Sequence, residues 1–251
     1  MKFILSFILI TLGITAGNAQ QLFISKGKIE FEKTINIYKQ MEDEVDGDNQ
    51  NTFMELFKTS LPKSKTYYFD MYFDAGRSLY KPGKDDLPPV VNQWILGPGN
   101  ENIVYKDLNK QESISRKGIY DNTFLIQDSL RKIEWKITND TRTIAGFECR
   151  KATAIIMDSI YVVAFYTDQI LTSSGPESFG GLQGMILGLA IPRLHTTWFA
   201  TKVEVVNFKE QELAPPTKGK KITQSDLKEQ LKKSLKDWGK EGTRNVWQSS
   251  I

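Results

Sequence analysis

Apolar and polar residues alternate along most of the chain, and a period of two is typical of half-buried strands. Ile29, Phe31, Ile35 and Ile37 fall on one face of a first strand. Residues 67–73 follow the same rule with aromatic side chains on both faces, which is typical of a strand between two packed surfaces. The pattern therefore predicts one long strand that contains residues 29–37 and a second at 67–73.

Further strands are expected on either side of these two. Residues 53–59 are predicted to form a hairpin with 67–73 through a turn at 61–64. The same alternation predicts strands at 102–107, 111–117, 123–128, 134–137, 143–144, 147–157, 159–167 and 193–208. Roughly ten strands in series with short connections predict a mainly β fold, a large curled antiparallel sheet that resembles an open half-barrel.

A helix is predicted near the end of the chain, after a proline- and glycine-containing linker at 215–219. Thr223 and Asp226 resemble a capping box, and Gly239 is placed to end the helix. Its apolar face consists of Leu227, Leu231, Leu235 and Trp238. We expect the helix to cover an edge or mouth of the sheet and the residues after Gly239 to form a loose tail.

One connection departs from the usual polar composition of loops. Residues 175–189 contain five glycines between apolar side chains, which predicts a segment folded back onto the core. Such a segment is a candidate lid or wall of a ligand cavity. The candidate ligand-binding residues are Gly175, Pro176, Glu177, Phe179, Gly181, Leu182, Gly184, Met185 and Ile186. Glu177 is the polar member of this set, and we read it as a cap or as a polar anchor in a pocket.

The hexapeptide at 181–186, Gly-Leu-Gln-Gly-Met-Ile, resembles the signature of the GLPGLI family. The surrounding order strengthens the resemblance: Trp135, then the block at 144–152 with its Gly, Phe, Cys, Lys and Ala, then Ala-Phe-Tyr-Thr at 164–167. Gln183 and Met185 depart from the family's Pro and Leu. The resemblance implies a β-rich protein exported by Gram-negative bacteria, without a settled biochemical function and without catalytic residues to carry over.

The amino-terminal residues 1–19 read as a secretory signal peptide. Lys2 precedes an apolar run at 3–12, and Gly17 and Ala19 supply small residues for cleavage before Gln20. The residue directly after the cleavage point is Gln20 and not a cysteine, so lipid attachment there is not expected. No later apolar run reaches the roughly 20 residues of a membrane-spanning helix. We therefore predict a periplasmic or secreted protein, organised as a β domain at 20–214 followed by linker, helix and tail at 215–251.

Charge is nearly balanced, with 33 basic and 30 acidic residues. Because phosphate backbones are bound by concentrated positive fields, this balance argues against nucleic acid as the main partner. The lysine-rich end of the chain is expected to be a solvated helix face. We expect a monomer that carries no cofactor.

Cys149 and His195 are the only cysteine and the only histidine. A positive charge beside a thiol lowers its pKa, but Arg150 and Cys149 are neighbours on a strand and point to opposite faces, and free cysteines are usually buried. A core position is therefore expected for Cys149 and a structural or surface position for His195. A joint Cys149–His195 metal or thiol site is the alternative. The acidic loop at 42–51 lacks the final Glu of a calcium-binding loop, so calcium is not predicted.

Three functions follow from these observations. The leading hypothesis is a cell-envelope binding or carrier module, not an enzyme, whose curled sheet encloses an apolar or lipid-like small molecule. The second is a protein–protein interaction module that docks an envelope protein through the glycine-rich segment. The third is a metal-binding or thiol enzyme that uses Cys149 and His195.

Overall fold

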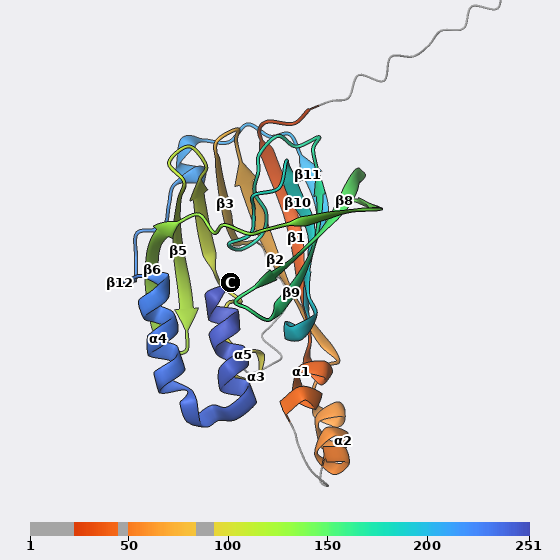
Figure 1. Ribbon diagram of the computed structural model, residues 1–251, viewed down its shortest axis with the longest axis vertical. Coiled ribbons are helices and arrows are strands. Elements are labelled where there is room, and N and C mark those ends of the chain that lie inside the picture. Colours follow the sequence, from red (N-terminus) through yellow and green to blue (C-terminus); the bar gives the residue numbers. More distant parts are fainter. Residues whose placement is uncertain (1–22, 45–49, 84–92) are drawn as a thin grey trace, which may run out of the picture.

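Twelve strands form one open sheet in this computed structural model, which describes residues 23–44, 50–83 and 93–251 (Figure 1). The predicted signal peptide lies outside these residues, as do positions 45–49 of the acidic loop and 84–92. The strands are β1 Gly27–Asn36, β2 Ser64–Phe73, β3 Arg77–Pro82, β4 Ile103–Asp107, β5 Glu112–Ile119, β6 Asn122–Ser129, β7 Lys136–Ile144, β8 Phe147–Ile156, β9 Ile160–Thr167, β10 Met185–Ile191, β11 Thr196–Glu204 and β12 Lys220–Ile222.

The strand order is β12-β6-β5-β4-β3-β2-β1-β11-β10-β9-β8-β7. Neighbours pair antiparallel throughout the described sheet except β12, which runs parallel to β6. The sheet curls, so that β5 and β6 face β8 and β9 across a central space (Figure 1). The predicted mainly β fold, an open curled antiparallel sheet with a covering helix near the end of the chain, is confirmed.

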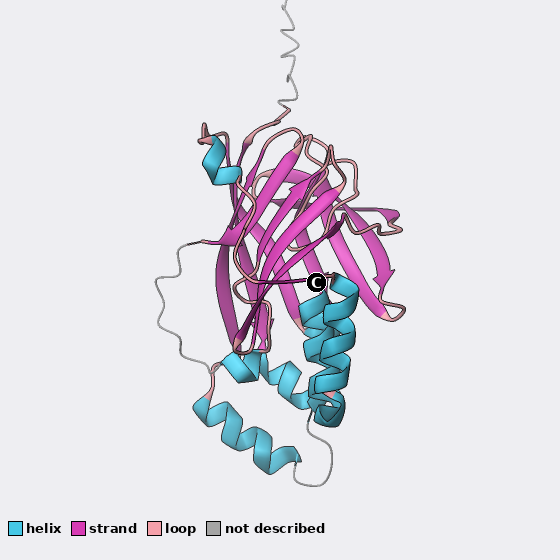
Figure 2. Cartoon of the chain, turned by 90° about the vertical axis from the view of Figure 1, so that its left-hand side faces the viewer, coloured by secondary structure: helices cyan, strands magenta, loops and turns pink. Residues whose placement is uncertain are grey.

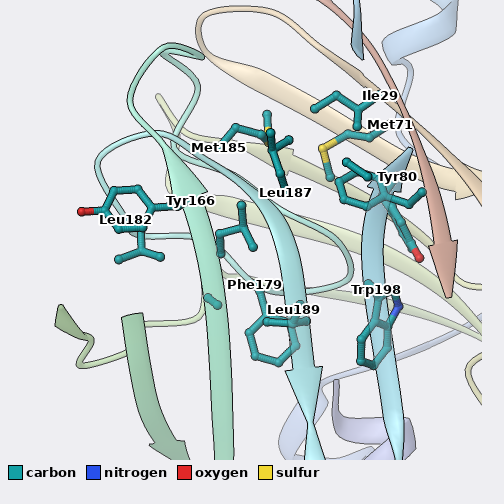
Figure 3. Close-up of a cluster of buried hydrophobic side chains, with 14 of the residues drawn as sticks. Ile29, Met71, Tyr80, Tyr166, Phe179, Leu182, Met185, Leu187, Leu189 and Trp198 are labelled. Atoms are coloured by element: carbon teal, nitrogen blue, oxygen red, sulfur yellow. The ribbon is translucent and has the colours of Figure 1, made fainter. Parts of the chain in front are cut away.

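The core lies on the inner face of the sheet. Alternate residues of β1 and β2 point into it, including Ile29, Phe31, Phe69, Met71 and Phe73, each at most 1% exposed. They pack in one cluster with side chains of β9, β10 and β11, of which Tyr166, Leu187, Leu189 and Trp198 are drawn in Figure 3. The predicted inward faces of the first long strands are thus confirmed, and this half of the curl is filled with side chains.

Residues predicted as the 53–59 strand form a helix instead. The segment belongs to α2 Gln50–Ser60, which follows α1 Ile37–Glu44. Met54, Phe57 and Leu61 repeat at helical spacing and pack in a separate apolar cluster with Met41 of α1. The period is therefore 3.6 rather than 2, and β2 pairs with β3 rather than with this segment.

Three strands were missed and one was predicted too long. β3 and β12 were not expected, and the second half of the glycine-rich segment forms β10, which pairs with β9 and β11. The predicted 193–208 strand is β11, preceded by the short 3-10 helix η1 Pro192–Leu194. A strand buried on both faces, as β10 is, shows no alternation by which sequence could reveal it.

The chain closes with two helices rather than one helix and a tail. Thr223 caps α4 Gln224–Ser234 as predicted, and Leu227, Leu231 and Leu235 are buried. After η3 Lys236–Trp238, residues Gly239–Ser250 form α5, so the predicted loose tail is wrong. These helices lie toward one end of the sheet with α1 and α2 (Figure 2). The last residues of α5 run into the curl of the sheet, where the backbone N–H of Ser178 donates to the main-chain oxygen of Ile251 at 3.2 Å.

Three short elements complete the chain. They are α3 Gln93–Leu96, η2 Glu210–Leu213 and the η3 turn already named. Leu213 of η2 packs with Leu79 and Tyr105 on the outer face of the sheet. No helix among the described residues is long and apolar enough to cross a membrane.

Candidate functional site

The glycine-rich segment 175–184 lies inside the curl of the sheet. Glu177, Phe179 and Leu182 are at most 4% exposed, whereas Gly181 and Gln183 are exposed. Of the predicted ligand-binding set, Gly181 lines a cavity, and Met185 and Ile186 are buried in β10. Most of the predicted residues are therefore part of the core behind the site.

One ammonium group bonds to three backbone carbonyls of this segment. Lys106 Nζ, on β4, donates to the carbonyls of Gly175 at 2.6 Å, Glu177 at 2.9 Å and Phe179 at 2.6 Å. These three bonds use every donor of the ammonium group. Burial lowers the pKa of Lys106 to about 7, and the charge of Glu177 opposes that shift. Lys106 thus bonds residues 175–179 to β4, and we refer to residues 175–181 as the wall.

Glu177 is the carboxylate at the centre of this wall. Its Oε2 accepts a hydrogen bond from Asn102 at 2.8 Å, and its Oε1 lies 3.7 Å from the ammonium of Lys33. Lys33 also donates to the carbonyl of Gly99 at 2.6 Å. Burial lowers the pKa of Lys33, and Glu177 opposes the shift. Glu177 therefore balances buried positive charge, a role that neither the cap nor the pocket-anchor prediction described.

A cavity of about 480 Å³ opens beside the wall. β4, β5, β6 and residues 129–132 form its sides, and Ser178 closes it against the glycine-rich segment. Its lining combines hydroxyl, amide and cationic groups with a few apolar side chains: Val104, Lys106, Ser113, Ser115, Lys117, Ile126, Asp128, Ser129, Leu130, Arg131, Lys132, Ser178, Gln224 and Ile251. The volume suits a small-molecule site.

A second cavity of about 310 Å³ adjoins the first. The two share Lys106, Leu130, Arg131, Lys132 and Ser178, and the second extends along Gly180 and Gly181. Trp135 fixes this end, because its indole N–H donates to the carbonyl of Gly180 at 2.9 Å. Because they share these residues, we treat the two cavities as one groove.

Two cations of the groove face the last residues of α5. Lys117 of β5 is 2% exposed, and its ammonium donates to the carbonyl of Ser249 at 3.0 Å. Arg131 is half-buried and donates to the carbonyl of Ser250. Burial lowers the pKa of Lys117 to about 8, with a further contribution from the charge of Arg131, while Glu177 opposes the shift. Burial also lowers the pKa of Arg131.

Cys149 lies in the core, as expected. Its side chain is fully buried, and its thiol lies 3.5 Å from the carbonyl of Phe147. Burial raises the pKa of Cys149 to about 12, so the thiol is neutral at physiological pH.

His195 pairs with Asp43 and not with Cys149. Its Nε2 lies 2.9 Å from Asp43 Oδ2, and its backbone is left-handed with φ 48°. Across the described ranges, no group of three or more His, Cys, Asp or Glu side chains gathers closely enough to hold a metal ion.

The groove's key residues were not predicted from sequence. Lys33, Asn102, Lys106, Lys117 and Arg131 were missed. One signal was present in the sequence. Lys106 and Lys117 follow Val104 and Ser115 by two residues and therefore lie on the inward face of their strands, where an uncharged side chain is expected.

The fold and this groove define a class of protein: an open curled β-sheet module with a polar, cationic cavity on its inner face. The sequence model of the family described as N-glycanase peptide, N-terminal domain, matches residues 92–227. The chain belongs to this family. No curated protein sequence matches the chain.

Two solved structures of PNGF-II, in different space groups, share the fold. They match at 14% and 15% identity over 82% and 90% of this chain, each with a TM-score of 0.51. The chain spans about a third of their length, since the matches cover 33% of each PNGF-II chain.

Proposed function

We propose that this chain is a non-catalytic binding module for a glycan-type ligand, a small polyhydroxylated molecule held in the groove beside the 175–181 wall. The observation that supports this most is the lining of the larger cavity. Ser113, Ser115, Ser129, Ser178 and Gln224 present hydroxyl and amide groups there. Such groups donate and accept hydrogen bonds, as recognition of sugar hydroxyls requires.

Pre-formed walls favour binding. The 175–181 segment is held by Lys106 and by the indole of Trp135, so little order remains to be imposed when a ligand arrives. Because ordering costs free energy on association, a rigid site binds more tightly than a mobile one with the same contacts. The lid predicted from sequence is replaced in this proposal by a fixed wall.

The chemistry of the groove favours a polar ligand over an apolar one. The apolar part of the curl is filled by its own side chains, among them Phe179, Leu187 and Leu189. The remaining space is bordered by Lys106, Lys117 and other polar groups. Burying an apolar molecule there would leave those groups without water or a partner. The apolar carrier of the sequence prediction is therefore the alternative outcome of the test.

The family description supports the ligand class. It names an N-glycanase, and the present chain corresponds to about a third of PNGF-II in length. We propose that the module contributes glycan binding rather than hydrolysis. We propose as well that the protein is exported through the predicted signal peptide, as the GLPGLI resemblance implies. Export fits the proposed ligand, since glycan ligands are found outside the cytoplasm.

The proposal is tested by titrating the full chain with N-acetylglucosamine and its β-linked dimer while recording backbone amide NMR shifts. We expect saturable shifts at residues of β4 to β6 and 175–181. Ser129→Trp, on the exposed rim of the cavity, should abolish them by filling its mouth. Thr141→Trp, equally exposed but on β7, is the matched control and should bind normally.

Three results would contradict the proposal. The first is an absence of saturable shifts with neutral and with acidic sugars. The second is shifts that persist in Ser129→Trp. The third is a lipid retained by the native protein in mass spectrometry, which would support the apolar carrier instead.

A further inference from the structure

We propose that Lys117 and Arg131 form an anion-recognition site within the groove, which selects ligands bearing a carboxylate or sulfate group. This inference rests on the proposed glycan-binding function and names the class within it, an acidic saccharide. It is carried by the placement of two cations that lack a negative partner, next to an open volume that contains polar groups.

The ammonium group of Lys117 has more N–H donors than its one hydrogen bond uses. An ammonium group has three N–H donors, and one of these is bonded, to the carbonyl of Ser249 at 3.0 Å. Its side chain is 2% exposed, so water does not supply the full solvation that a charge needs. Among the described residues no carboxylate lies within ion-pair distance of it.

Arg131 complements Lys117 in geometry. Its guanidinium is planar with five N–H donors and is suited to two parallel bonds with a carboxylate or sulfate. It donates to the carbonyl of Ser250, the residue next to the one that Lys117 contacts. Since adjacent carbonyls of one turn receive both donors, the two cations converge on one region of the groove. Their mutual repulsion contributes to the lowered pKa of Lys117. A bound anion would relieve that repulsion.

Other charges nearby do not supply the missing anion. Lys106 adds positive charge to the lining, but its three donors are committed to the 175–179 backbone. Glu177 turns its carboxylate toward Asn102 and Lys33. Asp128 is the carboxylate side chain of the lining, and it lies exposed at the rim, where solvent screens it. Ile251 also borders the cavity, and its main-chain oxygen accepts a hydrogen bond from the backbone N–H of Ser178 at 3.2 Å. Among the side chains of the inner groove, cations therefore outnumber carboxylates.

The hydroxyl groups and the second cavity indicate more than a bare ion. Ser113 and Ser115 stand on the same strand face as Lys117 and border the same cavity. Arg131 and Ser178 border both cavities, so a ligand whose acidic group meets Arg131 has room for further rings on either side. These features fit an acidic saccharide, either a uronic acid or a sulfated sugar.

The test compares glucuronate and N-acetylglucosamine 6-sulfate with neutral N-acetylglucosamine by isothermal titration calorimetry. Lys117→Gln and Arg131→Gln should each weaken binding of the acidic sugars by about tenfold or more, because each removes a charge-assisted hydrogen bond. Binding of the neutral sugar should change by less than about threefold, since it does not engage the charge. Lys136→Gln is the matched control: it removes an exposed charge on β7, outside both cavities, and should have little effect.

A pH series gives a second readout. Lys117 is charged below its pKa of about 8, so the affinity for acidic sugars should fall as pH rises from 7 to 9. Lys117→Gln should remove this dependence, and neutral sugar should show none. If circular dichroism shows that Lys117→Gln is unfolded, Arg131→Gln and Arg131→Lys carry the test, with Arg131→Lys recovering part of the binding.

The outcomes separate the two proposals. Acidic and neutral sugars that bind equally, with equal losses in the variants, overturn the anion site and leave glycan binding intact. If no sugar binds while inorganic sulfate binds and is lost in both Gln variants, the anion site stands and glycan binding fails. If neither sugars nor sulfate bind, both proposals fail.

Discussion

Gly184 is the residue whose replacement tests the fold of the glycine-rich segment most directly. It stands immediately before β10 with φ +134°, a backbone conformation that L side chains rarely adopt. A Cβ built there would overlap the carbonyl oxygen of Thr167 at the end of β9 and stand 3.0 Å from the Cα of Asp168. Both neighbours are backbone atoms, so neither can turn aside. Gly184→Ala must therefore move a strand or change its own backbone conformation.

The magnitude follows from two additive costs. Forcing a non-glycine residue into a sparsely populated backbone region costs about 1–3 kcal/mol. Displacing packed backbone around an added methyl group costs about 1–3 kcal/mol more. We expect Gly184→Ala to lower the free energy of unfolding by about 4 kcal/mol.

Two other glycines calibrate this expectation. Gly181 also has positive φ, +83°, but an added Cβ meets only the indole nitrogen of Trp135 at 4.0 Å. Gly181→Ala should therefore cost the backbone term alone, about 1–2 kcal/mol. Gly118 in β5 has ordinary φ and nothing within 4 Å of an added Cβ. Gly118→Ala should be neutral or stabilising by up to about 1 kcal/mol.

Urea unfolding, followed by tryptophan fluorescence and circular dichroism, measures all three variants. The expected order of stability is Gly118→Ala, then Gly181→Ala, then Gly184→Ala. If Gly184→Ala is as stable as Gly181→Ala, the close approach of β9 is not a constraint and the reasoning fails.

Three further predictions concern single side chains. Lys106→Met should destabilise the protein at pH 7 by about 2–4 kcal/mol, since it leaves three buried carbonyls without a donor. Because the pKa of Lys106 is lowered to about 7 in the fold from an unfolded value near 10.5, its charge is disfavoured on folding. Stability should thus rise with pH between about 7 and 10, and Lys106→Met should weaken that rise in urea titrations at each pH. Cys149, neutral and buried, should react with a maleimide at pH 7 only as fast as the protein unfolds; rapid labelling of the native protein would contradict the core assignment. Thr223→Ala removes the hydroxyl that accepts the amide of Asp226 at 3.1 Å and should cost about 1 kcal/mol, with unchanged thermal stability as the refuting result.

Local patterns were reliable where one face of an element is apolar and the other polar. β1 satisfies this condition, and β2 and the meander of β4 to β6 were also predicted to within a few residues. The cap at Thr223 and the buried Leu227 stripe were predictable for the same reason. The helix α2 was mistaken for a strand because the apolar residues Met54 and Leu56 are two positions apart, which also fits a short alternation when their neighbours are ignored.

The candidate site was not accessible from local pattern. Lys106 is at position 106 in the chain, and the carbonyls it holds are at 175–179. Arg131 and Ser250 are separated by more than a hundred residues, yet they are in contact. No periodicity relates such positions, since the contacts depend on how far the sheet curls and where α5 ends.

By itself, the sequence determined the class of fold, the inward faces of its long strands, the buried state of Cys149 and the segment whose glycines matter. These depend on residue type and short-range spacing, which sequence contains in full. Tertiary structure alone decided that Lys106 bonds to the glycine-rich segment, that β10 is a central strand and that Lys117 and Arg131 border one cavity. The physical reason is that buried charges gain their partners, or are left without them, only when distant segments of the chain are brought together.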